Sequence, residues 1–416
     1  MYSISTTQER SLLWLLALVQ FTIIMDFMVM MPLGPQLMHA FNITPVAFAT
    51  AVSMYSWCSG LSGLLAATYI DRFDRRRLLM IAYALFALSN LICALANSYE
   101  LLLFARAFAG ITGGMLGSVV MAIVSDVIPA QRRGAAMGII MTAFSLAAIA
   151  GVPAGVLLGA HFSWAAPFVL LVVLSGLVWI AAIKVVPSLT EHLKQNPPVL
   201  SEVLPNLWRL FSNARHLNAF AFTFTMMASQ MMVIPFISPV LVANHGVAPA
   251  QLSWIYMAGG AATFFTSRVV GRLADRYGNK RVFRIAVILS AFPILFVTHM
   301  PALPFILIVL FFPFFMVTVS GRIIPMQALL TTVPEPAHRG AFLSANSAIQ
   351  ALGTGCGAWL GGLMLSNTAT GQIEGYGMVG WAAVGLAILA MLWIDHVRGT
   401  RVPVQATKPL ETEAAG

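Results

Sequence analysis

The protein has 416 residues, of which 59% are hydrophobic and only 9% are charged. A soluble domain carries about 25% charged residues, so this composition excludes a soluble globular enzyme, and it also excludes a disordered chain, which would be poor in apolar residues. The formal net charge of +9 does not indicate a nucleic-acid partner, because the basic residues lie in short loops between apolar runs and not on one soluble face.

Apolar runs of about 20 residues, the length that an α-helix needs to cross a bilayer, follow one another along the chain. The first run lacks a small-residue cleavage site and is expected to remain as a helix, not to be removed as a signal peptide. We predict an all-α membrane protein with twelve transmembrane helices, near residues 12–34, 47–70, 78–96, 101–124, 135–160, 164–186, 217–243, 251–271, 281–299, 302–327, 341–366 and 375–395.

The twelve predicted spans fall into two groups of six. We expect an N-terminal six-helix bundle within residues 1–186 and a C-terminal six-helix bundle within residues 217–395. The polar, proline-containing residues 187–216 are predicted to form a cytoplasmic linker along the membrane surface, and residues 396–416 a cytoplasmic tail.

Lysine and arginine are confined to alternate loops. The basic loops contain Arg72, Arg133, Arg272 and Arg339, whereas the loops at 39–46, 97–100, 244–250 and 367–374 contain neither Lys nor Arg. By the positive-inside rule, we predict a multi-pass protein of the cell inner membrane with both termini in the cytoplasm.

Two basic loops recur at an offset close to half the chain length. Asp71 and Asp275 stand in similar segments 204 positions apart, and Arg133 and Arg339 stand in a second similar pair 206 positions apart. The two halves are therefore predicted to be parallel repeats, an arrangement that places a substrate path between the halves near the membrane midplane.

The repeated loops carry a family resemblance. Residues 271–281 read Gly-Arg-Leu-Ala-Asp-Arg-Tyr-Gly-Asn-Lys-Arg, which resembles the cytoplasmic signature of the major facilitator superfamily. In the first copy Ala67, Tyr69 and Asp74 replace the leading Gly, the Leu and the inner Gly, while Asp71, Arg72, Arg75 and Arg76 remain. The resemblance spans essentially the whole chain and implies a transporter, not an enzyme.

Three further segments are similar to motifs of the twelve-span drug/proton antiporters in that superfamily. Residues 26–33 resemble their first-helix motif, residues 106–110 their fourth-helix motif, and residues 147–155 their fifth-helix antiporter motif, with Gly151, Pro153 and Gly155. The resemblance implies exchange of substrate for protons, with no cofactor beyond the coupling proton. Pro153 is expected to bend its helix.

Asp26 and Arg106 are the candidate proton-coupling residues, because ionisable groups inside a membrane normally face a cavity or a partner. At 1.5 Å per residue, Asp26 lies about 21 Å above the cytoplasmic side and Arg106 about 8 Å below the outer side, so both are expected at similar height. They could pair or compete for one proton. The alternative is a static pair that only holds helices together.

Two other arginines fall within predicted spans. Arg268 lies three residues before Gly271, close enough to the cytoplasm for its side chain to extend to water. Arg322 lies deeper, and no carboxylate of the second half is predicted at its depth. It could bind an anionic substrate or repel a proton, and the sequence leaves both open.

A second group of charges is predicted to form a cytoplasmic gate that holds the outward-facing state. The carboxylate of Asp126 at a helix C-terminus opposes the helix dipole and needs a cation nearby. The predicted gate comprises Asp71, Arg72, Arg75, Asp126 and Arg133 in the first half and Gly271, Asp275, Arg276, Gly278 and Arg339 in the second half. The alternative is a set of solvated loop charges.

The expected substrate cavity combines adaptable apolar side chains with polar ones that would lose hydrogen bonds in lipid. The polar residues could instead join helices. The candidates are Gln20, Thr22, Met30, Met227, Gln230, Phe315, Arg322, Asn346 and Gln350.

The favoured function is proton-coupled export of small hydrophobic or amphipathic compounds, as in multidrug efflux, by alternating access of two halves. An alternative is a proton-coupled carrier of a sugar or organic anion, and a more remote one is an intramembrane enzyme or assembly factor. The last would need a nucleophile–base set or a His cluster in the spans, whereas the eight His lie in loops or at helix ends. We expect a monomer in contact with lipid, without metal or nucleic acid.

Overall fold

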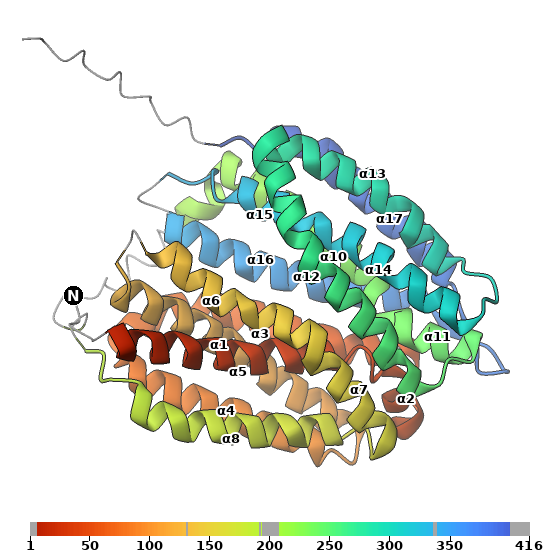
Figure 1. The fold of residues 1–416 in the computed structure, drawn as a ribbon, viewed down its shortest axis with the longest axis horizontal. Coiled ribbons are helices and arrows are strands. Elements are labelled where there is room, and N and C mark those ends of the chain that lie inside the picture. Colours follow the sequence, from red (N-terminus) through yellow and green to blue (C-terminus); the bar gives the residue numbers. More distant parts are fainter. Residues whose placement is uncertain (1–5, 130–131, 191–192, 194–207, 336–338, 400–416) are drawn as a thin grey trace, which may run out of the picture.

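The computed structural model describes residues 6–129, 132–190, 193, 208–335 and 339–399. Its helices form two bundles that lie side by side, the first coloured red to yellow and the second green to blue (Figure 1). Much of the predicted linker and tail, at 191–192, 194–207 and 400–416, lies outside the described residues.

Helices cover each predicted span of the first half. Two spans are interrupted: α1 passes through a turn at residues 30–33 into α2, and α6 continues through a π-helix, η2, into α7. The bounds are α1 Thr6–Val29, α2 Gly34–Phe41, α3 Pro45–Tyr69, η1 Ile70–Arg72, α4 Arg75–Ala94, α5 Tyr99–Val127, α6 Arg133–Leu146, η2 Ala147–Gly151, α7 Val152–His161 and α8 Ala166–Val185.

The second half repeats this pattern and adds one small antiparallel hairpin, in which Ser366 pairs with Glu374. The bounds are α10 Ala214–Val233, η4 Ile234–Phe236, α11 Ile237–His245, η5 Pro249–Gln251, α12 Leu252–Tyr277, α13 Asn279–Thr298, α14 Phe305–Gly321, α15 Ile323–Leu330, α16 Arg339–Leu363, β1 Ser366–Asn367, β2 Ile373–Glu374, α17 Tyr376–Trp393 and η7 Ile394–His396.

The helices begin where the sequence supplies caps. The hydroxyl of Thr44 accepts a hydrogen bond from the amide of Ala47 ahead of α3, and Ser98 does the same for Leu101 ahead of α5. Both side chains satisfy amide groups that the first helical turn leaves unpaired. At the other end of a helix, Gly246 adopts φ +65° and stops α11, a backbone conformation that glycine tolerates best.

Nine helical spans of the described chain are long and apolar enough to cross a membrane, and the α2–α3 pair makes a tenth if it is counted as one broken span. The other two predicted spans correspond to α12 and α16. α3 packs against α16, and α12 packs against α7. These contacts join the two halves. α12 and α16 are thus less apolar than the other spans because part of their surface contacts protein instead of lipid.

The contact between α3 and α16 is close and partly polar. The Ser53 hydroxyl donates a 2.7 Å hydrogen bond to the carbonyl oxygen of Gly355, and the rings of Trp57 and Trp359 lie 6.1 Å apart. On the other flank, a Cβ at Gly260 of α12 would lie 2.7 Å from the Ala148 carbonyl oxygen. Small residues thus allow the backbones of the two halves to approach.

The buried apolar residues form three clusters that differ at the two ends of the molecule. We call the end with the arginine-rich loops the basic end and the other the neutral end. Toward the neutral end one shared core includes Met25 and Phe48 of the first half and Phe236 and Phe312 of the second. Toward the basic end each half has a core of its own, and Leu64 of α3 packs on the second-half core.

Within the first half, α5 lies directly against α3 because glycines face the contact. A Cβ at Gly114 would collide with the backbone carbonyl of Ser59, whereas a Cβ at Gly117, one turn further along α5, would meet nothing within 4 Å. The two glycines therefore make a matched pair for measuring how much the close α3–α5 contact contributes to the free energy of unfolding.

We expect Gly114→Val to lower the free energy of unfolding by about 1–3 kcal/mol, the usual cost of overpacking, because the backbone of α3 would have to move. Gly117→Val should have little effect. Thermal unfolding of the purified variants in the same detergent measures the difference. Equal unfolding temperatures for the two variants would contradict the close packing of α3 and α5.

Candidate functional site

Asp26 and Arg106 form an ion pair inside the first bundle. The Nη1 of Arg106 on α5 donates a 2.6 Å hydrogen bond to Oδ1 of Asp26 on α1, and both side chains are fully buried. The two side chains, predicted from the sequence to lie at similar height, are thus in direct contact. Breaking such a pair leaves an uncompensated charge in a dry interior, which costs several kcal/mol.

An aromatic ring covers the arginine. The guanidinium carbon of Arg106 lies 4.6 Å from the centroid of the Tyr55 ring on α3. The geometry depends on glycines, because a Cβ at Gly110 would collide with the Tyr55 carbonyl and one at Gly113 would lie 2.8 Å from the Tyr55 hydroxyl. Gly110 of the motif and Gly113 just beyond it therefore let α3 come close enough to place Tyr55 over the charge.

The pair retains unused hydrogen-bonding capacity. Oδ2 of Asp26 and Nε and Nη2 of Arg106 are buried and have no hydrogen-bond partner. A purely structural buried pair would be expected to satisfy these atoms. Asp26 thus has an oxygen that can accept a proton, and Arg106 has donors that can take another acceptor when the carboxylate is neutralised.

The predicted antiporter motif lies beside the same helix. Residues 147–151 form the π-helix η2, and Pro153 follows at the start of α7. A Cβ at Gly151 would touch Phe21 of α1 at 3.3 Å, and one at Gly155 would collide with Val29. The motif thus packs against the part of α1 that carries Asp26, and Ala148 within it faces Gly260 of the second half.

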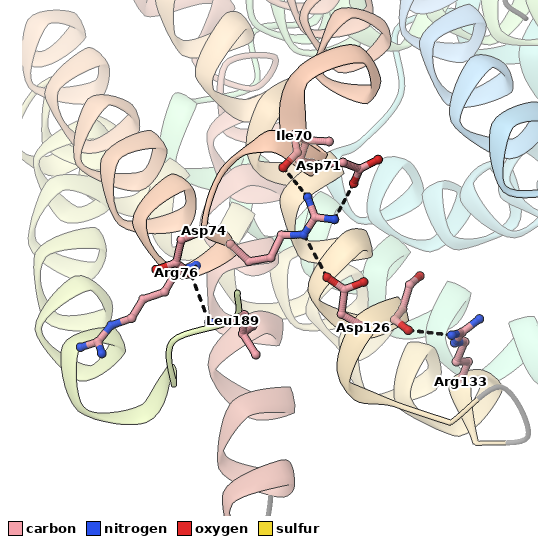
Figure 2. A network of polar contacts seen from close by, with 9 residues as sticks. Ile70, Asp71, Asp74, Arg76, Asp126, Arg133 and Leu189 are labelled. Carbon is pink, nitrogen blue, oxygen red and sulfur yellow. Dashed lines mark hydrogen bonds and ion pairs between the residues drawn. The ribbon is translucent and has the colours of Figure 1, made fainter. Parts of the chain in front are cut away.

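Part of the predicted gate forms a compact network at the basic end of the first half (Figure 2). The guanidinium of Arg75 is buried and donates to Asp71 at 2.5 Å, to Asp126 at 2.9 Å and to the carbonyl of Ile70. Arg75 is thus the cation that the carboxylate of Asp126 near the end of α5 needs. This network holds η1, α4 and α5 together.

The other first-half gate residues occupy different positions. Arg133 donates to the carbonyls of Ser125 at 2.6 Å and Ile128 at 3.0 Å, so it caps the end of α5 (Figure 2). Asp74 accepts from the amides of Arg76 and Leu189, and Arg72 is exposed.

The second-half gate residues do not join the network. Asp275, Arg276, Gly278 and Arg339 are exposed, and Gly271 is partly buried. Each ion pair between described residues joins two residues of the same half. Among the residues that the structure describes, no ion pair therefore joins the two halves at the basic end in this conformation.

The two copies of the signature loop have different backbone conformations at the position of the inner glycine. Gly278 has φ +88° and ψ 140° between α12 and α13, a conformation that favours glycine. At the corresponding position in the first half, Asp74 has φ −58° and caps α4 with its side chain. The replacement of glycine by aspartate in the first copy is thus accommodated by a different turn.

The predicted cavity residues fall into separate environments. Met30, Met227 and Phe315 are buried, Gln20 and Gln350 are partly buried, and Oε1 of the buried Gln230 has no hydrogen-bond partner. Two polar residues join helices: the Thr22 hydroxyl lies 3.0 Å from the Tyr83 hydroxyl, and Asn346 accepts a 2.8 Å hydrogen bond from Thr223.

Arg322 lies between α14 and α15 and is fully buried. Its Nε donates to the Val319 carbonyl at 3.2 Å, and neither Nη1 nor Nη2 has a hydrogen-bond partner. By contrast, Arg268 is exposed, with its guanidinium carbon 5.7 Å from the centroid of the Phe264 ring.

Three residues of α3 were not predicted to be functional from the sequence: Ser53, Tyr55 and Trp57. A signal was present, because this span carries Ser53, Tyr55, Ser56, Ser59 and Ser62 within ten residues. Serine and hydroxyl groups at this density are typical of a helix that contacts other helices. The helical period alone does not tell which of these side chains meets an arginine from another helix.

Comparison with known proteins identifies relatives along the whole chain. The sequence model described as Major Facilitator Superfamily matches residues 16–231 and again residues 219–414. The chain is 24% identical over 405 residues to the uncharacterized MFS-type transporter YbcL of Bacillus subtilis (strain 168), which covers 96% of this chain and 98% of that protein. It is 27% identical over 222 residues to a probable sugar efflux transporter of Mannheimia succiniciproducens, covering 53% and 54% of the two chains.

Solved structures share the fold. A bacterial homolog of the human lysosomal transporter Spinster, in an inward-facing and occupied conformation, superimposes with a TM-score of 0.78 at 15% identity, covering 95% of this chain and 98% of that one. A D-xylose–proton symporter gives a TM-score of 0.75 at 16% identity, covering 94% and 99%. At these identities the likeness concerns the fold alone.

We expect Arg75→Met to lower the free energy of unfolding by about 1–3 kcal/mol, because Asp71, Asp126 and the Ile70 carbonyl lose their shared charged donor. Arg77→Met, which replaces an exposed arginine two residues away, serves as the control. Thermal unfolding of both variants measures the effect. An unfolding temperature for Arg75→Met equal to that of the control would show that the network contributes no stability.

Proposed function

Because the chain belongs to the Major Facilitator Superfamily, we propose that it is a proton-coupled exporter of small hydrophobic or amphipathic organic compounds that works by alternating access. The protein is a multi-pass membrane transporter and not an enzyme.

The observation that carries the proposal is the buried ion pair of Asp26 and Arg106, with an unpartnered oxygen on the carboxylate. Protonation of Asp26 would cancel its charge and release Arg106 in surroundings where Coulomb energies are far larger than in water. The positive charge of Arg106 would then need new compensation, such as entering water or a new hydrogen-bond acceptor. Proton binding is thereby linked to a rearrangement of the bundle.

We infer that α3 would link the ion pair to the contact between the two halves. Tyr55 lies over Arg106. Ser53, two residues before Tyr55, donates a 2.7 Å hydrogen bond to the carbonyl of Gly355 on α16. Trp57, two residues after Tyr55, packs on Trp359 of α16. We infer that a change in the Arg106–Tyr55 contact alters the α3–α16 contact, on which the two halves would tilt.

The conformation supports a working cycle of this kind. The shared core closes the neutral end, and separate cores lie at the basic end. If the basic end is cytoplasmic, as the loop charges predict, this is the state closed toward the outside of the inner membrane. The proposed unit is a monomer that uses protons as coupling ions and no other cofactor.

A second candidate is export of a sugar or other polar metabolite. It is favoured by the relatives named as probable sugar efflux transporters, which include proteins of Mannheimia succiniciproducens and Helicobacter pylori. Buried polar groups without partners, such as Oε1 of Gln230, also support a substrate with hydrogen-bonding groups. A panel of compounds with and without such groups separates the two candidates.

Asp26→Asn should abolish proton-linked transport because an amide cannot take up and release the coupled proton. Inside-out vesicles are acidified by respiration, and a pH-sensitive dye reports proton efflux as ethidium, 4-methylumbelliferyl glucoside or 4-methylumbelliferyl glucuronide is added. We expect wild type to respond to at least one compound and Asp26→Asn to none. Asp395→Asn, on the exposed surface, is the control. A normal response from Asp26→Asn would refute its role in coupling.

Asp275→Asn should slow the cycle without weakening binding, because Asp275 is exposed here and would meet the first-half network only when the basic end closes. We expect the maximal transport rate to fall about tenfold, equivalent to 1.4 kcal/mol of transition-state energy. The half-saturating concentration should stay nearly unchanged. The opposite outcome, weaker apparent affinity at an unchanged maximal rate, would argue against a gate.

A further inference from the structure

Arg322 differs from every other buried charge in the described part of the chain. Four Asp, Glu, Lys or Arg side chains are buried there: Asp26, Arg75, Arg106 and Arg322. The first three belong to ion pairs. Arg322 is fully buried, yet both of its terminal nitrogens lack a hydrogen-bond partner.

The cost of this arrangement is large. Removal of an ammonium- or guanidinium-sized ion from water is unfavourable by several kcal/mol even after the protein relaxes, unless an anion and hydrogen bonds compensate. The carbonyl of Val319 satisfies only Nε. Since Asp26 and Arg106 cancel each other and Arg75 is paired, Arg322 is the one buried cation of the described residues that has no ion-pair partner.

The position of Arg322 directs it into the protein. Buried residues recur along the broken span at Phe312, Phe315, Val319, Arg322 and Met326, spacings that place them on one helical face. Phe314 and Leu310 are exposed on another face. The guanidinium therefore lies on the side that faces other helices, where the headgroup of a bilayer lipid is not expected.

Its depth is suited to substrate entry from the basic end. Arg322 precedes the last residue of α15 by eight positions, which corresponds to about 12 Å of helix. It lies where the shared core, which includes Val319, meets the core of the second half, which includes Met326. A compound that enters between the halves from the basic end would come to this depth before reaching Asp26.

We propose that Arg322 binds an anionic group of the transported compound, a carboxylate or a phosphate. The two free Nη nitrogens of a guanidinium form a planar fork that matches two oxygens of such a group. This assignment rests on the proposed export function and narrows its substrate class to amphipathic organic anions. The apolar residues of the shared core, such as Phe312 and Phe315, would contact the rest of the compound.

The test uses matched probes that differ in charge. Wild type, Arg322→Met and the control Arg268→Met are placed in nanodiscs of zwitterionic lipid, with no proton gradient. Thermal unfolding is measured with 4-methylumbelliferyl glucuronide against the glucoside, and with 4-methylumbelliferyl phosphate against 7-methoxy-4-methylcoumarin, which has no ionisable group. We expect at least one anionic probe to raise the unfolding temperature of wild type and Arg268→Met by several degrees more than its neutral partner. Arg322→Met should lose that difference.

The stability of the unliganded variant separates binding from a structural role. Removing an unpaired buried charge should leave Arg322→Met at least as stable as wild type without probe. A clear loss of stability, no preference of wild type for either anionic probe, or an equal preference in Arg322→Met would overturn the proposal. Stabilisation of wild type but not Arg322→Met by phosphatidylglycerol alone would assign the site to a lipid headgroup and overturn it too.

These outcomes are independent of proton coupling. The same binding measurement in an Asp26→Asn background should still show the anion preference, because it involves no gradient. Loss of the anion preference with a normal proton response would leave the export function standing. Loss of the proton response with the anion preference retained would leave the Arg322 site standing.

Discussion

The pairing of Asp26 with Arg106 is the constraint around which the first half is arranged. Two charges without access to water must lie in contact, so α1 and α5 must present them at one height and on facing sides. The glycines of α5 let α3 approach until Tyr55 covers the guanidinium, and the small residues of η2 and α7 pack against α1 beside Asp26.

Close helix contact in this protein comes from small residues, and the same residues permit relative movement. The α3–α16 contact has one side-chain hydrogen bond to a glycine carbonyl and an aromatic pair, without an ion pair between described residues. The two helices can therefore tilt against each other without breaking a buried ion pair. The ion pairs between described residues instead lie within each half. In the first half, Arg75 joins η1, α4 and α5 into a unit that can move as one body.

The two halves repeat in fold but have diverged in charge. The first half holds a neutral buried pair and an aspartate where the second half needs a glycine with positive φ. The second half keeps a buried arginine with two unpartnered nitrogens. This division places the buried ion pair in one bundle and the proposed anion-binding arginine in the other.

The membrane-spanning helices, the internal repeat and the similar depth of Asp26 and Arg106 could be predicted from the amino-acid sequence, because span length, hydropathy and helical rise are local properties. The contacts between helices could not. They include the Tyr55 ring over Arg106, the hydrogen bonds of Thr22 with Tyr83 and of Asn346 with Thr223, and the separation of the second-half gate residues from Arg75. Those contacts depend on which helices are neighbours and on the rotation of each helix about its axis. Helix periodicity leaves both undetermined, and the packing of residues distant in sequence settles them.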